Sequence, residues 1–248
     1  MGDNKINKTI LNFRGYGLLK SEFDFKELNN LRHELTVTPK NLSSFSGMGA
    51  NIPSYSIYQE SEKRLYIPKH FGLQKFGLPD KDKLKEGLDI NLRFNGELRE
   101  NQVKPVESYL KAAKDDTRCG GLINLPCGFG KTSISLYIIS KLQKKTLVIV
   151  HKDFLLKQWR ERIEQFLPDA RIGIIKAKVI DIEDKDIVVG SLQSLSMKEY
   201  DKGTFDEFGF MIADEVHHLS SEVFSRALQK INCRYSLGLS ATMTRKDV

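Results

Sequence analysis

Hydrophobic and polar positions alternate between two periods from Gly120 onward. Short β-branched runs such as Thr146–Val150 indicate strands that are buried on both faces, and the segments between them carry apolar residues at helical spacing. The segment Asp153–Phe166 predicts a helix that Asp153 can cap at its start. The apolar positions of this helix are Leu155, Leu156, Trp159, Ile163 and Phe166.

The same criteria predict a regular succession of strands and helices up to residue 239. The predicted strands cover residues 121–125, 146–150, 171–175, 186–189, 208–213 and 235–239. The predicted helices cover residues 131–143, 153–166, 192–198 and 221–230. Because strands that alternate with helices form a parallel sheet with helices on both faces, we expect an α/β domain here.

The residues before Gly96 follow a less regular pattern. Residues 25–35 predict a short helix, and residues 55–59 and 64–68 predict the two strands of a hairpin. Residues 43–53 are rich in Ser, Gly and Pro, which is typical of a loop. This part of the chain therefore predicts a small α+β module.

One further strand is predicted just before the α/β domain, because apolar and polar residues alternate there. Its apolar positions are Leu88, Ile90, Leu92 and Phe94. We place the boundary near Asn95 and Gly96. The expected organisation is an α+β module over residues 1–95 and an α/β domain over residues 96–248.

The composition is that of a globular protein, with 40% hydrophobic and 29% charged residues in a chain of 248. The net charge of +7 fits a polyanionic partner such as nucleic acid, and equally a basic surface that keeps the protein soluble. The three cysteines, Cys119, Cys127 and Cys233, form no CxxC pair, which favours a reducing compartment. No apolar run is long enough to span a bilayer and no secretory signal is evident, so we expect an intracellular protein without a membrane partner.

A glycine-containing loop between a predicted strand and a predicted helix is typical of a phosphate site. Gly128 and Gly130 allow backbone N–H groups to approach phosphate oxygens, Lys131 can reach the β- and γ-phosphates, and the Thr132 hydroxyl can bind Mg²⁺. Leu125 stands where the general P-loop pattern has its first glycine. The predicted ATP-binding loop comprises Pro126, Cys127, Gly128, Phe129, Gly130, Lys131 and Thr132, with Cys127 interpreted as a small loop residue.

Two adjacent carboxylates close the predicted strand over residues 208–213. Asp214 and Glu215 thus lie at the edge of the sheet where open α/β folds bind ligands. We predict that Asp214 binds Mg²⁺ and that Glu215 orients or activates the attacking water. The adjacent His217 and His218 do not indicate a metal site, because neighbouring residues rarely point to one ion.

The order LPCGFGKT, DEVHH and LSAT resembles the ATPase core of superfamily 2 helicases. The XPB/UvsW-like branch is the most similar, together with its relatives in large DNA viruses such as the poxvirus-type transcript-release helicase. LPCG before FGKT, DEVH rather than DEAD, and the run YSLGLSATMTRKD carry this resemblance, which covers residues 98–248. It implies a RecA-like P-loop domain that hydrolyses ATP with Mg²⁺ to move on DNA. The implied location is the nucleus or the cytoplasm or, for a viral protein, the virion or the cytoplasm of the infected cell.

The resemblance also implies roles for residues outside the two central motifs. Gln102 would read the adenine edge and Arg99 would support the nucleotide site, with Asn101 where an aromatic residue is usual. His217 would communicate with the second motor domain. The segment Ser240, Ala241 and Thr242 would couple the ATP site to the nucleic-acid track.

Four residues would contact the sugar–phosphate backbone, again by resemblance. They are Lys152, Gln158, Ser191 and Gln193. Lys152 and Gln158 equally fit an ordinary solvated helix surface, and the helical spacing of Trp159 assigns that residue to the core.

The family's motor has two RecA-like domains, and the second supplies arginine fingers. This sequence carries only the motifs of the first, so we expect the chain alone to bind Mg²⁺–ATP weakly and to hydrolyse it poorly. Alternative functions are an RNA helicase, a restriction-type DNA motor, or a non-catalytic nucleic-acid-binding module whose nucleotide site is a scaffold or switch. The aromatic and basic residues of the N-terminal module either bind DNA or form the core of that module.

Overall fold

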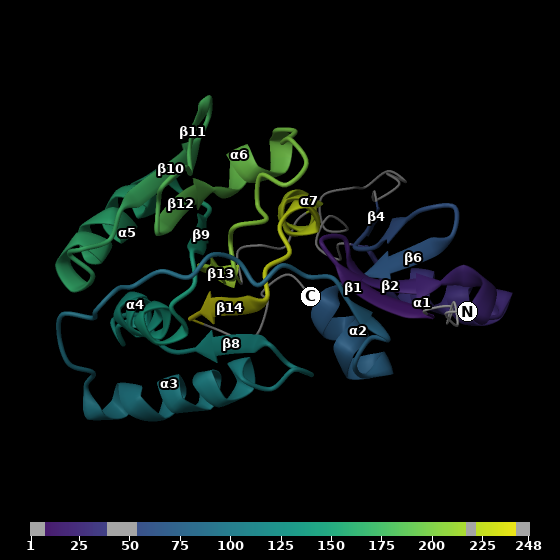
Figure 1. The fold of residues 1–248 in the computed structure, drawn as a ribbon, viewed down its shortest axis with the longest axis horizontal. Coiled ribbons are helices and arrows are strands. Elements are labelled where there is room, and N and C mark those ends of the chain that lie inside the picture. The colour runs from purple at the N-terminus through teal and green to yellow at the C-terminus, as the bar shows by residue number, and fades with distance from the viewer. Residues whose placement is uncertain (1–7, 39–53, 217–221, 242–248) are drawn as a thin grey trace, which may run out of the picture. The chain divides into compact units, whose positions relative to one another are not determined.

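The computed structural model describes residues 8–38, 54–216 and 222–241 (Figure 1). The predicted loop over residues 43–53 and the residues His217, His218 and Thr242 lie outside this part of the chain. The described residues divide into two compact units at Leu84 and Lys85. Each unit is described by itself.

The first unit is built on a five-stranded sheet with the strand order β5-β6-β2-β1-β7. Its strands are β1 (Thr9–Asn12), β2 (Gly15–Leu19), β5 (Gln59–Glu60), β6 (Arg64–Ile67) and β7 (Lys81–Asp82). The other elements are η1 (Lys20–Glu22), α1 (Phe25–Glu34), α2 (Lys69–Phe76) and the strand pair β3 (Thr36–Val37) and β4 (Tyr55–Ser56). Leu11, Leu18, Leu31, Leu65 and Leu73 lie in the core between these elements.

The predicted helix of this unit is confirmed as α1, whose start is fixed by the Asp24 side chain accepting from the backbone N–H of Glu27 at 2.7 Å. The predicted hairpin is confirmed only in part. Gln59 pairs with Tyr66 as expected, whereas β4 pairs with β3 and leaves the hairpin. The first half of the predicted strand over residues 55–59 was therefore assigned to the wrong partner, because β-propensity does not specify which strand pairs with which.

The second unit contains a seven-stranded sheet with the order β11-β10-β12-β9-β13-β14-β8. All neighbouring strands are parallel except β11, which forms an antiparallel hairpin with β10. The strands are β8 (Gly120–Asn124), β9 (Thr146–Val150), β10 (Ile172–Lys176), β11 (Val179–Asp181), β12 (Ile187–Ser191), β13 (Phe210–Ala213) and β14 (Tyr235–Ser240).

Helices cover both faces of this sheet (Figure 1). One face packs against α3 (Glu100–Ala113), α4 (Lys131–Leu142) and α5 (Asp153–Phe166), and the other against α6 (Leu192–Met197) and α7 (Glu222–Lys230). Alternate strand residues divide between the two faces. Val148 and Val150 join the first core, whereas Leu147 and Ile149 join the second.

This arrangement confirms the predicted RecA-like α/β fold, and every predicted strand and helix of the α/β domain is present within two residues at each end. Two elements were not predicted, namely α3 and β11. The capping prediction was wrong. Asp153 is the first residue of α5 rather than its cap, and its carboxylate instead forms an ion pair with Lys176, with an N–O distance of 2.9 Å.

The strand predicted from Leu88 to Phe94 was also wrong. The segment is extended, but among the described residues it forms only an isolated bridge, between Asp89 and Lys144. Its other backbone bonds go to loops and to the Gln143 side chain, which bonds both the N–H and the C=O of Leu92. Leu92 lies on the side of the segment that packs on the α/β core. This one-sided packing produces the alternating pattern without pairing to a neighbouring strand. Residues 85–94 therefore belong to the second unit.

Candidate active site

The strand order sorts the predicted motifs along one edge of the seven-stranded sheet. The six parallel strands all end at this edge, where α/β folds bind ligands. The phosphate loop follows β8, Ser240 ends the neighbouring β14, and Asp214 follows β13. Lys152 and Ser191 come at or just after the ends of the next strands, β9 and β12. The ATP motifs thus occupy one half of the edge and the predicted nucleic-acid contacts the other.

The phosphate loop has the backbone geometry that its glycines predict. Gly128 and Gly130 have φ values of +79° and +90°, in a region that residues with a side chain rarely adopt. Gly130 is the residue that precedes α4, so the loop leads directly into a helix N-terminus. The Nζ of Lys131 donates to the backbone carbonyl of Leu125 at 3.1 Å, which holds this ammonium group over the loop.

Gln102 connects α3 to the phosphate loop. Its side chain is buried, and its Nε2 donates to the backbone carbonyl of Phe129 at 2.8 Å. Its Oε1 accepts from the backbone N–H of Arg99 at 3.0 Å, while the Arg99 residue itself is exposed. Gln102 thus holds the start of α3 against the loop. Its predicted contact with adenine stays a prediction.

Asp214 is buried and oriented by several groups. Its backbone N–H donates to the carbonyl of Ile149 at 3.0 Å, which fixes it beside the end of β9. Its Oδ2 accepts from the indole Nε1 of Trp159 at 2.8 Å, and the carboxylate also accepts from the backbone N–H of Glu215. Glu215 is half-buried with a φ of +55°, an unfavourable conformation for a glutamate that is typical of functional sites.

Burial raises the pKa of the Asp214 carboxyl above its ordinary value, and the negative charge of Glu215 acts in the same direction. The hydrogen bonds from Trp159 and from the Glu215 backbone lower the pKa, as does the positive charge of Lys131, but the sum of these effects is smaller. A cation beside Asp214 would favour its ionised form. The electrostatics therefore suit a site that takes up positive charge.

The donor set fits ATP with Mg²⁺. Magnesium prefers hard oxygen ligands and is usually held by one or two carboxylates together with substrate phosphates and water. Thr132 offers a hydroxyl at the first turn of α4, and Asp214 offers a buried carboxylate. In the part of the chain that the structure describes, no group of three or more His, Cys, Asp or Glu side chains is suited to hold a metal ion by itself.

The end of β14 lies against the start of the phosphate loop. Ser240 is buried, and its carbonyl accepts from the backbone N–H of Leu125 at 3.0 Å. Ala241 follows at the same edge, half-buried. Ser240 and Ala241, the described residues of the motif predicted to couple ATP to nucleic acid, therefore lie next to the phosphate loop. In the strand order they stand between this loop and Asp214.

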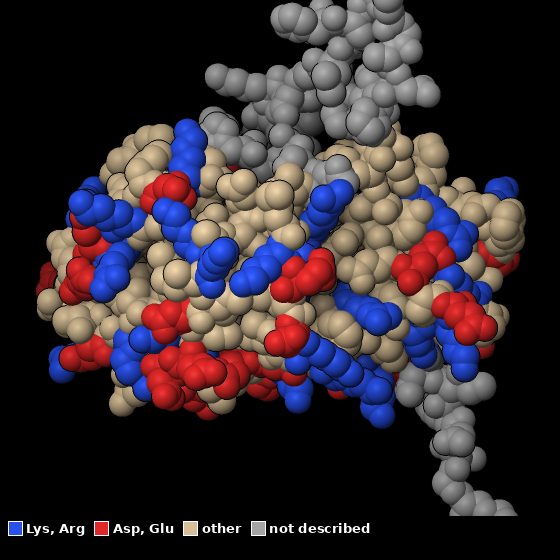
Figure 2. All heavy atoms as spheres, turned by 90° about the horizontal axis from the view of Figure 1, so that it is seen from above, with Lys and Arg blue, Asp and Glu red and all other residues tan. Residues whose placement is uncertain are grey.

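The predicted backbone-contact residues are only partly brought together. Lys152 and Gln193 are exposed and Ser191 is half-exposed, close to the ends of β9 and β12. Gln158 is exposed on α5, about 9 Å further along the helix than Lys152. The sequence pattern did not single out Lys176, which ends β10 at the same edge and contacts the first residue of α5. On the face shown in Figure 2, basic and acidic side chains are interspersed, so net charge alone does not locate an interface.

In the first unit, most of the interleaved aromatic and basic residues make internal contacts. Tyr66 and Lys69 are buried, and Tyr58, Phe71 and Phe76 pack around the core. Lys75 and Arg64 also have partners within the unit: Lys75 forms an ion pair with Glu34, and Arg64 donates to the carbonyls of Lys8 and Gly17. Among the described residues, no helix is long and apolar enough to cross a membrane.

Comparison with known proteins agrees with this geometry. Residues 95–245 match the family described as type III restriction enzyme, res subunit. A protein of Acanthamoeba polyphaga mimivirus, named as a candidate ATP-dependent RNA helicase, is 33% identical over 246 residues, covering 98% of this chain and 47% of its own length. The DNA 3'-5' translocase XPB2 of Sulfurisphaera tokodaii is 34% identical over 184 residues, covering 72% of this chain and 39% of its own length.

The fold is also similar to that of a solved helicase. The UvsW helicase of bacteriophage T4 superposes with a TM-score of 0.58 at 20% identity, over 89% of this chain and 87% of that structure. The chain spans less than half the length of the two curated relatives named above. The chain belongs to the family described as type III restriction enzyme, res subunit, and over this domain it is similar to proteins named as a helicase and a translocase.

Proposed function

We propose that this domain hydrolyses ATP to move along DNA, and that it does so when a second RecA-like domain completes the site. The observation that carries the proposal is the order of motifs along one sheet edge, with the phosphate loop, Ser240 and Asp214 on three adjacent strands. The residues next to them on β9 and β12 are those expected to contact a sugar–phosphate backbone. An ATP site and a nucleic-acid track would thereby be adjacent on a single sheet.

Each residue of the ATP half has a role that follows from its chemistry. The backbone N–H groups of Gly128 and Gly130 and the ammonium of Lys131 bind the phosphates. Thr132 and Asp214 would hold Mg²⁺, which when bound neutralises charge that develops on the phosphate oxygens. Glu215 would hold the attacking water and accept its proton. Gln102, which joins α3 to the loop, and Arg99, whose backbone N–H donates to Gln102, would face the adenine end of the nucleotide.

The nucleic-acid half is proposed to bind phosphates along the ends of β9, β12 and β10. Lys152, Ser191 and Gln193 supply donors there, and Lys176 extends the row by one strand because β10 pairs with β12. Lysine binds phosphate as a point charge without reading sequence. This half would therefore position the strand without selecting its bases.

The assignment of Glu215 is tested by Glu215→Gln, which removes the base and keeps the shape. We expect the 248-residue chain to bind nucleotide as before, and hydrolysis by the completed motor to fall by about 10²–10⁴-fold. Binding is measured by calorimetry and hydrolysis by phosphate release. Glu183→Gln, an exposed glutamate between β11 and β12, is the matched control. Hydrolysis that survives Glu215→Gln would show that another group activates the water.

The relatives differ in the nucleic acid that their names give, since one is named a DNA translocase and another an RNA helicase, so the choice of DNA over RNA needs its own test. The test compares ATP hydrolysis with duplex DNA, single-stranded DNA and RNA of the same length at several salt concentrations, because affinities for nucleic acid depend on salt. Stimulation by DNA over RNA supports the proposal. Stimulation by RNA alone would assign the motor to RNA, and an absence of stimulation by either would favour a scaffold or switch.

A further inference from the structure

Trp159 has a contact that its place in a core helix does not predict. It is the only tryptophan among the 248 residues, and its side chain is 1% exposed. Its indole ring packs in the same core as Leu155 and Ile163. Its Nε1–H nevertheless has a polar partner within this apolar environment, because it donates to Oδ2 of Asp214 at 2.8 Å in a fully buried bond.

The bond joins an element of the proposed ATP half of the sheet edge to an element of the proposed nucleic-acid half. Asp214 follows β13, and Trp159 lies on α5, the helix that follows the adjacent strand β9. An indole can only donate and an ionised carboxylate can only accept, so the pair has one allowed hydrogen-bond direction. The Trp159 ring is held in place by its packing, and the orientation of one Asp214 oxygen is held with it.

We propose that Trp159 is a positioning residue for the carboxylate that binds Mg²⁺, holding Asp214 with one oxygen turned toward α5 so that the other is available to the ion. The inference rests on the proposed Mg²⁺–ATP site. Groups that orient a metal ligand in this way typically change metal affinity or activity by about 10–100-fold when they are removed.

The same contact makes Trp159 an internal reporter of the site. Because it is the only tryptophan, its emission comes from one buried ring whose N–H is bonded to the carboxylate in question. Neutralisation of the Asp214 charge by a bound cation changes the electrostatic field at the ring. We expect Mg²⁺, added to the complex with a non-hydrolysable ATP analogue, to change the tryptophan emission of the unmodified chain.

The variant that isolates the hydrogen bond is Trp159→Phe, which keeps an aromatic ring in the core and removes the donor. We expect the Mg²⁺ concentration that half-saturates binding of the ATP analogue to rise by about 10-fold or more, with little change in nucleotide binding measured in EDTA. Ile163→Val is the matched control. It loosens the same helix and the same core at a residue one turn further along. Its Mg²⁺ requirement should stay that of the unmodified chain.

The possible outcomes are distinguishable. A shifted Mg²⁺ requirement in Trp159→Phe but not in Ile163→Val supports the inference. An unshifted requirement in a folded Trp159→Phe chain, or an equal shift in both variants, overturns it. If Trp159→Phe does not fold, the tryptophan emission of the unmodified chain is the test. Emission that does not change when Mg²⁺ is added to the nucleotide complex also overturns the inference. A chain that binds no nucleotide at all would instead contradict the proposed function.

Discussion

At the scale of single residues, the ATP site depends on backbone conformations that few side chains tolerate. Gly130 has a φ of +90°, and a Cβ atom built on it would lie 2.4 Å from Nε2 of Gln102. That amide is the group that connects α3 to the loop through the Phe129 carbonyl. The glycine therefore provides both the turn into α4 and the space for the contact that holds the turn.

Gly130→Ala is expected to destabilise the chain by about 1–3 kcal/mol and to weaken nucleotide binding, because alanine must either take a strained φ or displace Gln102. Urea unfolding measures the first effect and calorimetric titration with an ATP analogue the second. Gly121→Ala is the control. A Cβ at Gly121 would contact nothing within 4 Å, and the residue is exposed on β8, so a change within about 0.5 kcal/mol is expected. Equal behaviour of the two variants would contradict the assigned role.

The partners of single side chains were the part of the site that the sequence did not predict. The spacing of Trp159 correctly predicted burial, but periodicity says nothing about the partner of an indole N–H, so the bond to Asp214 appeared only in the structure. The positions of Lys131, Asp214 and Glu215 at the sheet edge were predictable because each lies in a motif that follows a strand. Lys176 was not, since its relevance comes from the pairing of β10 with β12.

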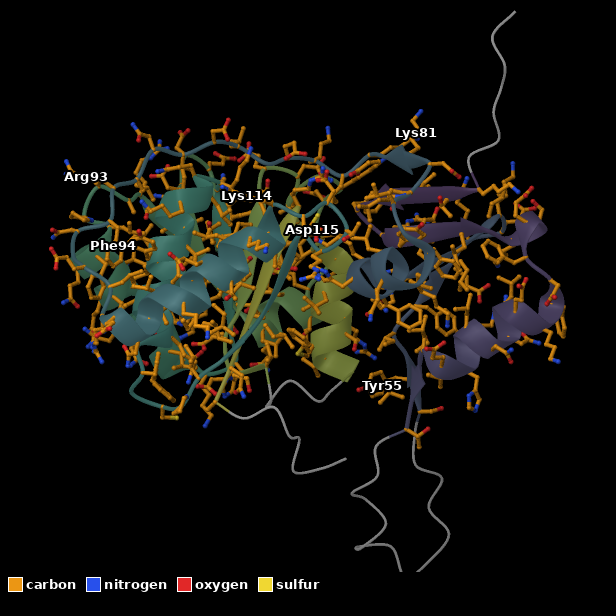
Figure 3. The ribbon with its side chains drawn as sticks, turned by 90° about the horizontal axis from the view of Figure 1, so that it is seen from below. Tyr55, Lys81, Arg93, Phe94, Lys114 and Asp115 are labelled. Atoms are coloured by element: carbon orange, nitrogen blue, oxygen red, sulfur yellow. The ribbon has the colours of Figure 1, made fainter. Side chains whose placement is uncertain are left out.

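At the scale of elements, the α/β domain was predictable because its strands are buried on both faces and read as continuous apolar runs. The N-terminal unit was less so. Its strands β3, β4, β5 and β7 have two residues each, too few to show a period. In the extended segment that ends at Phe94 the sequence shows the period of a strand, but the structure has no strand there. Phe94 (Figure 3) stacks on Phe166 with ring centroids 5.2 Å apart, so it alternates like a strand residue while packing on helices.

The β10 end and the start of α5 are connected by the ion pair of Lys176 with Asp153. A partly exposed pair of this kind contributes little to stability in water. Its lysine lies at the edge where a phosphate backbone is proposed to bind, and a phosphate can take the place of the carboxylate as its partner. Removing the Lys176 side chain is therefore predicted to weaken nucleic-acid binding and to leave the free energy of unfolding almost unchanged.

Lys176→Ala should leave the free energy of unfolding within about 0.5 kcal/mol of the unmodified chain. We expect it to weaken DNA binding and to lower the slope of log affinity against log salt by about 0.9, the value for one lost phosphate contact. Anisotropy of a labelled duplex across a salt series measures both. Lys114→Ala is the control, an exposed lysine after α3 and shortly before β8 begins (Figure 3). An unchanged slope in Lys176→Ala would remove β10 from the interface.

At the scale of the whole molecule, a charge of +7 spread among interspersed acidic and basic groups would attract DNA only weakly, and the contacts proposed at the sheet edge would position it. The described part of the proposed ATP site contains the phosphate loop, the Thr132 hydroxyl and the carboxylates of Asp214 and Glu215. Lys131 and the exposed Arg99 are the positively charged residues assigned to this site. Phosphoryl transfer develops charge on the phosphate oxygens that a further arginine usually stabilises.

Hydrolysis by the 248-residue chain alone is therefore expected to be slow even with DNA present. Joining the chain to a second RecA-like domain that supplies an arginine should raise turnover by about 10³–10⁵-fold, since an arginine finger contributes on that order. Phosphate release by the two proteins at equal nucleotide saturation measures the ratio. Glu215→Gln in the joined protein verifies that the gain belongs to this site. If the chain alone turned over many ATP molecules per second in response to DNA, its own residues would already complete the transition-state site.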